Sequence, residues 1–444
     1  MRTTGVTILH VALGPAQDLR DVIRIFNPQR PLEGEALRAY YADRGSDARQ
    51  QMRLFLDVAR DEPVSILFTG HGGSGKSTEL NKLIEELGDT YFVVKVRTGD
   101  VVPATDLTYV DVILIAAMAL FRAASDEGGI GRAPAQIVEG VWGRIAEVID
   151  RVIFGKLPYR RPATESEVTV KAGIPLVVHG LTLEFEARYK NESNTREAIR
   201  AHMRDRLSEV IEKANDLSAE IQRRYKQPVL IAVEDTDKPE PGRAAEIFFD
   251  HPQSLTAFNA SIIYTFPIAL RYNAGFSEVD RYFKCARMPN LPLHRRDGSP
   301  DECGRRVLDE AIARRMDQAL IAPEARHRII LASGGLMRTL IGLAQNAAVN
   351  AYARGASRIE DRDAERAIAD LRKDFAAALR SEDYPILAAR YRDKQLSSDD
   401  SLQTLLQMRA LLEYENGETW CDVHPAALPL VQERVPDFDP GTVE

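Results

Sequence analysis

The segment with the clearest chemistry is a glycine-rich loop that satisfies the pattern G-x-x-x-x-G-K-[ST] at every fixed position. Glycines in this pattern let backbone N–H groups turn inward around phosphate oxygens. Lys76 would place a positive charge on the β- and γ-phosphates of a nucleotide, and the Ser77 hydroxyl would hold Mg²⁺. We therefore predict that ATP and Mg²⁺ bind to the loop formed by Gly70, His71, Gly72, Gly73, Ser74, Gly75, Lys76, Ser77 and Thr78.

A group of carboxylates follows the apolar stretch Val229 to Val233. Such a pair serves hydrolysis because the metal ion and the attacking water need different partners. We expect Glu234 to hold Mg²⁺ together with Ser77, and Asp235 to polarise the water. Aspartate is more usual in the place of Glu234, so Asp235 and Asp237 remain the alternative holders of the two roles.

The elements around these residues alternate between strands and helices. The β-favouring stretch Val64 to Phe68 leads into the glycine loop, and the helix-forming stretch Ser77 to Leu87 leaves it. A long apolar helix is expected at Tyr109 to Ala124. The other expected strands are 91–96, 229–233, 260–265 and 282–286. Such alternation predicts an α/β fold in which helices cover a parallel sheet.

The composition divides the chain into four parts. We expect an N-terminal lead-in at 1–60, a P-loop core at 61–298, a helical lid at 299–380 and a winged-helix-like domain at 381–444. The lid is rich in alanine, arginine and leucine at helical spacing. In the last part, two helical stretches precede alternating segments around Asn416-Gly417, a strong hairpin signal.

An α+β insertion at about 125–226 interrupts the core. Val168 to Val170 and Leu181 to Glu186 alternate polar with apolar residues, which predicts a hairpin with one wet face. A charged helix is expected from about Thr195 to Tyr225. The apolar side chains of the hairpin would pack on a neighbouring subunit or on the domain itself.

Charge and cysteine content exclude several classes of protein. The chain of 444 residues has 58 basic and 66 acidic side chains, a net charge of −8, so any contact with nucleic acid must come from a local patch. Three scattered cysteines give no disulfide framework and favour the cytoplasm. The longest apolar run, Val112 to Phe121, is too short to span a membrane. We also interpret the apolar run Val6 to Leu13 as too short for an export signal.

Taken together, these motifs resemble the AAA+ and STAND branch of P-loop ATPases, with bacterial NLR-like STAND ATPases and archaeal origin-recognition ATPases as the nearest likenesses. The resemblance covers roughly residues 60–122, 227–345 and 383–430. The insertion, Glu234 and a weak adenine-pocket motif near Pro31-Leu32 depart from those families.

The resemblance implies roles for residues outside the two main motifs. Thr265 would contact the γ-phosphate or the water as sensor 1. Arg338, which follows the break at Ser333-Gly334-Gly335, would reach the γ-phosphate as sensor 2. Arg281 would act as an arginine finger in a neighbouring subunit, with Arg271 as the other candidate and a solvated arginine as the plain alternative.

Two functions compete at this stage. The first is an ATP-hydrolysing switch that forms a homo-oligomer in its ATP state and regulates a protein partner or effector, as in antiphage defence. The second is a DNA-bound initiator, loader or transposition ATPase. The C-terminal hairpin carries four acids, and the helix from Ser401 has no basic residue before Arg409, which favours the protein partner over DNA. The four acids are Glu413, Glu415, Glu418 and Asp422.

Overall fold

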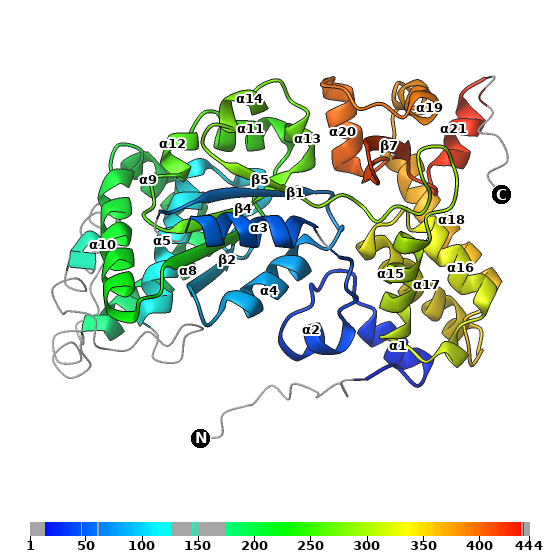
Figure 1. Ribbon diagram of the computed structural model, residues 1–444, viewed down its shortest axis with the longest axis horizontal. Helices are drawn as coiled ribbons and strands as arrows, with labels where there is room; N and C mark the ends of the chain where they lie inside the picture. The colour runs from blue at the N-terminus through cyan, green and yellow to red at the C-terminus, as the bar shows by residue number, and fades with distance from the viewer. Residues whose placement is uncertain are drawn as a thin grey trace.

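A computed structural model describes residues 14–45, 47–59, 62–125, 144–145, 147–149, 174–436 and 438. Its centre is a sheet of five strands in the order β2-β3-β4-β1-β5, and every neighbouring pair is parallel. The predicted parallel sheet is therefore confirmed (Figure 1). The strands are β1 (Ser65–Gly70), β2 (Phe92–Arg97), β3 (Val229–Glu234), β4 (Ser261–Pro267) and β5 (Lys284–Arg287).

Helices cover both faces of this sheet. On one face, α3 (Asp47–Val58) and α4 (Lys76–Leu87) pack on alternate strand residues such as Leu230 and Ala232. On the other face, residues such as Ile231 and Val233 pack under the remaining core helices. Burial on both faces explains why the strands are continuous apolar runs. The helices of the second face are α5 (Tyr109–Ser125), α10 (Leu207–Tyr225), α11 (Pro241–Phe249) and α12 (Pro252–Leu255), and the short connecting helices are η1 (Thr98–Asp100), η2 (Ala104–Asp106), α13 (Ile268–Arg271) and α14 (Phe276–Val279).

The predicted hairpin in the insertion is wrong. Residues 181–186 lie inside the helix α8 (Ile174–Asn191), and Val168 to Val170 lie outside the described residues. Val178, Phe185 and Tyr189 are buried, whereas Leu183 is 43% exposed. The buried positions are spaced by seven and four residues, which is helical spacing, so the alternation near Leu181 gave the wrong period. The described insertion is helical throughout.

The charged helix expected next is divided into α9 (Ser193–Met203) and α10. Two arginines of α9 attach the insertion to the core. Arg200 makes hydrogen bonds to both carboxylate oxygens of the buried Asp111 of α5, at 2.8 and 2.7 Å. Tyr189 donates a third hydrogen bond to Asp111, and Arg196 pairs with Asp106 at 2.7 Å.

The N-terminal segment joins the lid as well as the core. The helix α1 (Leu19–Ile25) packs against the lid helix α17, and its buried residues belong to the same apolar cluster as the lid. The next helix, α2 (Gly34–Tyr40), leads to α3. The lid consists of α15 (Glu302–Ala313), η4 (Gln318–Leu320), α16 (Pro323–Ala332), α17 (Met337–Ala353) and α18 (Asp361–Ala378).

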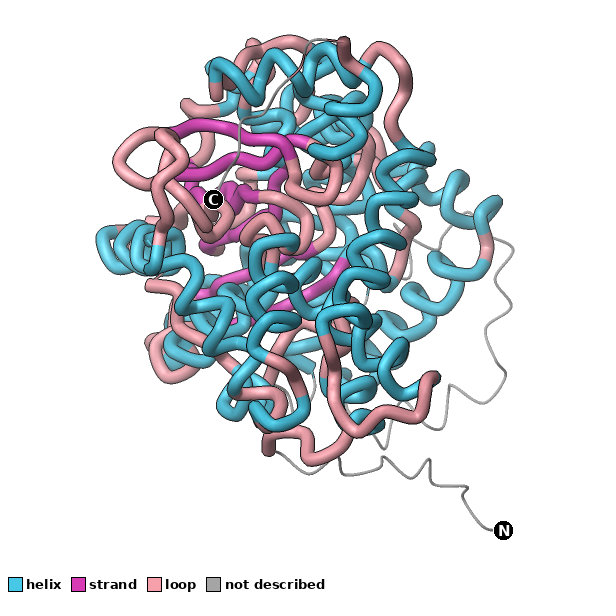
Figure 2. The backbone as a smooth tube through the Cα atoms, turned by 90° about the vertical axis from the view of Figure 1, so that its right-hand side faces the viewer, coloured by secondary structure: helices cyan, strands magenta, loops and turns pink. Residues whose placement is uncertain are grey.

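The C-terminal part has the predicted order of helix, helix and hairpin. The helices α19 (Asp383–Asp393) and α20 (Asp400–Met408) precede the antiparallel strands β6 (Leu411–Glu415) and β7 (Thr419–Val423), and α21 (Leu428–Arg434) follows. Gly417 in the turn has a φ of 99°. The helix α20 packs on α13 of the core. In the view of Figure 2, helices and loops enclose the strands. Among the described helices, none is both long and apolar enough to cross a membrane.

Candidate functional site

The glycine loop has the conformation that its sequence predicts. It connects the buried strand β1 to α4, which begins at Lys76. Gly70, Gly73 and Gly75 have φ values of 155°, 95° and 109°, a region that favours glycine. A Cβ atom on Gly73 would lie 2.7 Å from the Cβ atom of Arg338, so the lid approaches the loop as closely as a glycine allows.

Lys76 lies inside the loop and is almost completely buried. Its ammonium donates hydrogen bonds to the carbonyl oxygens of Gly70 and His71, at 2.6 and 3.1 Å. It also forms an ion pair of 2.8 Å with the Asp237 carboxylate. Burial by itself would raise the pKa of Asp237, but the Lys76 charge and a hydrogen bond with Thr265 lower that pKa below its usual value. Asp237, Lys76 and Thr265 therefore form one polar group at the ends of β1, β3 and β4.

The three carboxylates at the end of β3 and just after it point in different directions. Asp235 and Asp237 line the cavity next to the glycine loop, whereas Glu234 is not among its lining residues. The Glu234 side chain is completely buried and lies 2.9 Å from the ammonium of Lys95 on β2. The structure thus brings Asp235 and Asp237 to the loop and turns Glu234 toward α4, where Lys95 also meets Asn81.

Asp235 is held between two positive charges. Its carboxylate lies 3.6 Å from Arg97 and 2.9 Å from Lys238. Its backbone has a φ of 69°, and a Cβ atom on Gly99 would lie 2.8 Å from one of its carboxylate oxygens. Asp235 is therefore fixed by its backbone, by two cations and by a glycine across from it.

The end of β4 supports this group through two threonines. Thr265 is almost completely buried, and its carbonyl oxygen accepts a hydrogen bond of 2.5 Å from the hydroxyl of Thr236. The Thr265 hydroxyl faces Asp237, as the lowered pKa of that carboxyl reflects. The predicted sensor 1 residue thus lies at the cavity, next to Asp237 and Lys76.

The lid reaches the glycine loop through Arg338. Its backbone N–H donates a hydrogen bond of 2.9 Å to the carbonyl oxygen of Gly73, and its Nε atom donates one of 3.2 Å to Pro28. The preceding glycines, Gly334 and Gly335, have φ values of 61° and 77°. A Cβ atom on Gly335 would lie 1.9 Å from the carbonyl oxygen of Leu291. The Gly-Gly break is therefore a site of close packing that places Arg338 in the cavity.

The C-terminal part contacts the same loop. The backbone N–H of Glu413 on β6 donates a hydrogen bond of 2.8 Å to Nε2 of the buried His71. Tyr414, the next residue, donates one of 2.8 Å to the carbonyl oxygen of Gly334. Arg409, just after α20, lines the cavity, and burial together with the nearby Arg338 lowers its pKa. Three parts of the chain thus meet at the P-loop.

These contacts enclose a cavity of about 750 Å³ beside the glycine loop. This volume is within the range of about 300–1,000 Å³ that is usual for ligand sites. Sequence reasoning missed several of its residues, because their chain segments lie far from the motifs and only the fold brings them together. They are Arg97, Lys238, Arg315, Arg409 and the N-terminal residues Arg24, Ile25, 27–30 and Glu33. Pro31 and Leu32, the weak adenine-pocket motif of the sequence, also line the cavity.

The two arginine-finger candidates are not among the residues that line the cavity. The Arg281 side chain is 60% exposed and pairs with Glu278 on α14. Arg271 lies with its guanidinium 5.9 Å from the centre of the Phe276 ring. A role for Arg281 in a second subunit stays a prediction.

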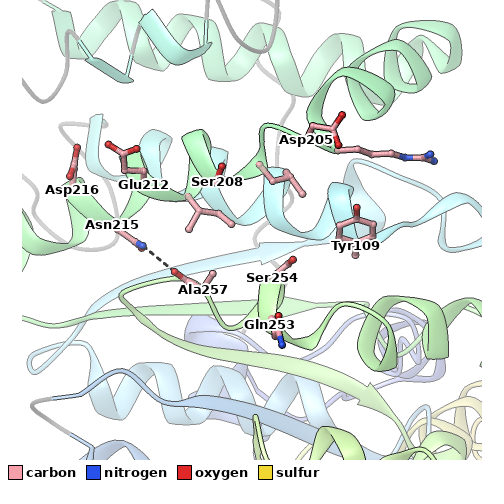
Figure 3. Close-up of a pocket in the computed structure, with 12 residues that line it drawn as sticks. Tyr109, Asp205, Ser208, Glu212, Asn215, Asp216, Gln253, Ser254 and Ala257 are labelled. Carbon is pink, nitrogen blue, oxygen red and sulfur yellow. Dashed lines mark hydrogen bonds between the residues drawn. The ribbon is translucent and has the colours of Figure 1, made fainter.

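A separate cavity of about 530 Å³ lies between α10, α12 and the start of α5. Figure 3 shows its acidic residues Asp205, Glu212 and Asp216 along one side and Tyr109 at the end. No residue of the glycine loop lines it, and we assign it no part in nucleotide binding.

No protein-family model and no curated protein matches the sequence. Among solved structures, the Walker-type ATPase paby2304 of Pyrococcus abyssi is 13% identical, with 92% of this chain and 99% of that chain covered and a TM-score of 0.47. The Aeropyrum pernix ORC1 protein in complex with DNA is 12% identical, with 94% and 97% covered and a TM-score of 0.42. The Thermotoga maritima RuvB Holliday junction branch migration motor is 12% identical, with 88% and 95% covered and a TM-score of 0.37. The fold class itself follows from the strand order and the glycine loop described above.

Proposed function

We propose that this chain binds ATP with Mg²⁺ at the glycine loop, hydrolyses it, and acts as a nucleotide-dependent switch for a protein partner. One observation carries the proposal: the N-terminal segment, core, lid and C-terminal part all contribute residues to one cavity at the P-loop. A ligand that fills such a cavity contacts four parts of the chain at once, and it can contact all of them in one arrangement of the parts only. Its gain or loss would change how these parts sit together.

The donor groups fit a nucleotide triphosphate. The N-terminus of α4 and the inward-turning glycines provide an anion site, and Lys76, Arg338 and Arg409 add positive charge on three sides. When a nucleotide binds, the Lys76 ammonium would give up its hydrogen bonds to the carbonyl oxygens of Gly70 and His71 and donate to phosphate oxygens. The N-terminal residues near Pro31 would cover the base, because Asn81 and Thr78 of α4 hydrogen-bond to Leu32.

We assign the metal role to Asp237 in place of Glu234. Mg²⁺ is usually held by one or two protein oxygens, with phosphates and waters completing its shell. Asp237 lies at Lys76, the residue before Ser77, whereas Glu234 is engaged with Lys95 on the far side of the strand end. Ser77 and Asp237 would hold the ion, which offsets phosphate charge when bound.

Asp235 keeps the role of activating water. A general base must be ionised and must lie within reach of the water that it polarises. Arg97 and Lys238 lie 3.6 and 2.9 Å from its carboxylate and orient it, and Thr265 would help to place the water. The same cations hold the Asp235 carboxylate, so hydrolysis would be slow until Arg97 is withdrawn.

The preference for a protein partner now rests on α20 rather than on the acidic hairpin. Glu413 and Asp422 are buried, and Asp422 pairs with Lys394 at 2.7 Å. The acids therefore give no free negative face. The helix α20, however, packs on α13, and Arg409 faces the nucleotide cavity. The helix α20 itself, which precedes the hairpin, has no basic side chain to offer to a DNA groove. We also propose a homo-oligomer in the ATP state, in a defence or regulatory role.

Phosphate release and ATP binding in three variants test the assignment. Asp235→Asn should bind Mg²⁺-ATP normally but lose turnover by about 10²–10⁴-fold. Asp237→Asn should lose the gain in ATP affinity that Mg²⁺ gives, and Glu234→Gln should keep that gain. Melting curves check folding in each case. Normal turnover in Asp235→Asn would contradict its role, and loss of the Mg²⁺ effect in Glu234→Gln alone would return the metal to Glu234.

Size measurement with a nonhydrolysable ATP analogue tests the oligomer. The particle should grow on binding, and Arg281→Ala should lose hydrolysis but not ATP binding. Mixed Arg281→Ala and Asp235→Asn subunits should regain turnover, because each supplies what the other lacks. A particle that stays monomeric with the analogue, together with no gain of turnover in the mixture, would contradict the oligomer and indicate a monomeric switch.

A further inference from the structure

A second groove lies between the edge of the sheet and the insertion helix α8. Its volume is about 580 Å³. One wall is β2 and the residues just after it, and the other wall is α8, with Arg122 of α5 between them. The lining residues are Lys95, Val96, Arg97, Asp100, Val101, Arg122, Leu183, Glu186, Ala187 and Lys190.

The wall formed by β2 is a strand edge. β2 is the last strand in the order of the sheet, and it pairs only with β3 there. The N–H of Phe92 points to β3, where it donates to Pro228. Residues of a parallel strand alternate in direction, so the backbone groups of Lys95 and Arg97 point away from β3. Among the described residues no strand pairs with this side of β2, and an edge of this kind can pair with an extended segment of another chain.

The wall formed by α8 offers apolar surface and positive charge. Leu183, Ala187 and Lys190 are exposed and follow each other at helical spacing on the side of the groove. Leu183 is one of the few large apolar side chains that the described residues expose, at 43%.

The charges of the groove differ in sign from those of the whole chain. It is lined by four cationic side chains and two anionic ones, whereas the chain has a net charge of −8. Glu186 is used by Arg122 at 2.7 Å.

Lys95 is used by the buried Glu234 at 2.9 Å, which leaves Lys190 and Arg97 as the cations for a ligand. Within the described part of the chain, the buried Nε atom of Arg97 has no hydrogen-bond partner, and its ion pair with Asp235 is long, at 3.6 Å. These features complement carboxylates.

We propose that this groove binds an extended, acidic segment of a protein partner, which adds to β2 as a further strand. This inference rests on the proposed function and names the partner's chemistry. Apolar side chains of the segment would contact Leu183 and Ala187, and its carboxylates would meet Lys190 and Arg97.

Binding there would reach the nucleotide site through Arg97. This residue lines both the groove and the nucleotide cavity, and it lies 3.6 Å from Asp235. A partner carboxylate at Arg97 would compete with Asp235 for the guanidinium. The Asp235 carboxylate would then be released from Arg97 and free to contact the attacking water, so occupation of the groove raises ATP turnover.

Fluorescence anisotropy on the full chain tests the binding directly. The probe is a labelled peptide of alternating sequence, Glu-Val-Glu-Leu-Glu-Val, which matches the six-residue length of β2. Two matched peptides carry lysine in place of glutamate, or N-methyl groups at every amide. The glutamate peptide should bind, and both matched peptides should lose binding, because one has the wrong charge and the other cannot pair with a strand edge.

Variants with matched controls locate the site. Lys190→Glu should weaken peptide binding by about twofold to fivefold, an amount typical of a partly exposed ion pair. Leu183→Gln should weaken it as well. Lys373→Glu on α18 and Val349→Gln on α17 make the same changes at exposed sites elsewhere and should bind as the wild type does.

The outcomes separate this inference from the proposed function. Peptide binding is measured without nucleotide, so it can succeed even if the chain does not hydrolyse ATP. Where hydrolysis is present, the peptide should raise turnover in the wild type and have less effect in Leu183→Gln. Equal binding of the N-methylated or lysine peptide, displacement of the peptide by a single-stranded oligonucleotide, or unchanged binding in both groove variants would overturn the inference.

Discussion

The two ends of the sheet domain are joined to their neighbours in different ways. At the phosphate end, the lid and C-terminal part approach the glycine loop so closely that Gly73 and Gly335 have no room for a side chain. At the insertion end, charged groups make the attachment. Arg196 of α9 pairs with Asp106 of η2, and Arg200 of α9 pairs with Asp111 of α5. Contacts made by close backbone approach require glycines, which can be recognised in the sequence. Contacts made by charge use arginines and aspartates, which look like any other charged residues in the sequence.

The largest effect on stability is expected at the insertion end. Asp111→Ala would leave the buried guanidinium of Arg200 without its main partner and remove the acceptor of Tyr189. Removing one member of a buried charge pair costs about 3–5 kcal/mol. Chemical denaturation should show this loss in the free energy of unfolding, while ATP affinity in the folded protein stays unchanged. A loss of ATP affinity as large as that caused by a substitution in the glycine loop would contradict the proposed difference between the two ends.

A glycine pair isolates the effect of close packing at the phosphate end. Gly335 and Gly355 have almost equal φ values, 77° and 75°, but only Gly335 has atoms within 4 Å of an added Cβ. Both alanine variants carry the strain of this backbone region, about 1–2 kcal/mol. Gly335→Ala should lose roughly 1–3 kcal/mol more by overpacking, and it should weaken ATP binding because Arg338 is displaced. Equal melting temperatures of the two variants would contradict the prediction, because the backbone at Leu291 would then move to make room for the added methyl group.

Much of the phosphate end was predictable, and its partners were not. The glycine loop, the strands and the break before Arg338 all follow from local patterns, because the backbone there needs particular residues. Arg97 and Arg409 join the site through folding alone. Glu234 and Asp237 show the same limit of sequence-based prediction. The sequence shows that acids lie at the end of the strand, but the direction of each side chain depends on its neighbours in the fold. At the insertion end, Leu181, Leu183 and Phe185 fit both a strand and a helix, and burial under α5 decides for the helix.

A smaller effect concerns pH and the contact between the C-terminal part and the loop. Burial lowers the pKa of His71 and of His424 to about 3, and the charge of Lys76 adds to the effect at His71. In the unfolded chain these groups titrate near 6.5. Between these values the unfolded chain binds more protons, so stability should fall as pH falls, by at most about 1.4 kcal/mol per pH unit for each histidine.

Melting temperatures from pH 7 to pH 5 test this coupling. His424→Asn should make the dependence on pH shallower, since one buried histidine is removed. His327→Asn, at an exposed position on α16, is the control and should follow the wild type. A steeper or equal slope in His424→Asn would contradict the assigned protonation.

Calorimetric titration with Mg²⁺-ATP tests the central claim most directly, because it measures occupation of the glycine loop without depending on turnover. Wild-type protein should bind one ATP per chain, and Lys76→Ala should lose that binding while still unfolding in one cooperative transition. Lys82→Ala removes an equivalent charge from the partly exposed side of the same helix and should bind as the wild type does. Equal ATP binding by Lys76→Ala and the wild type would contradict the account.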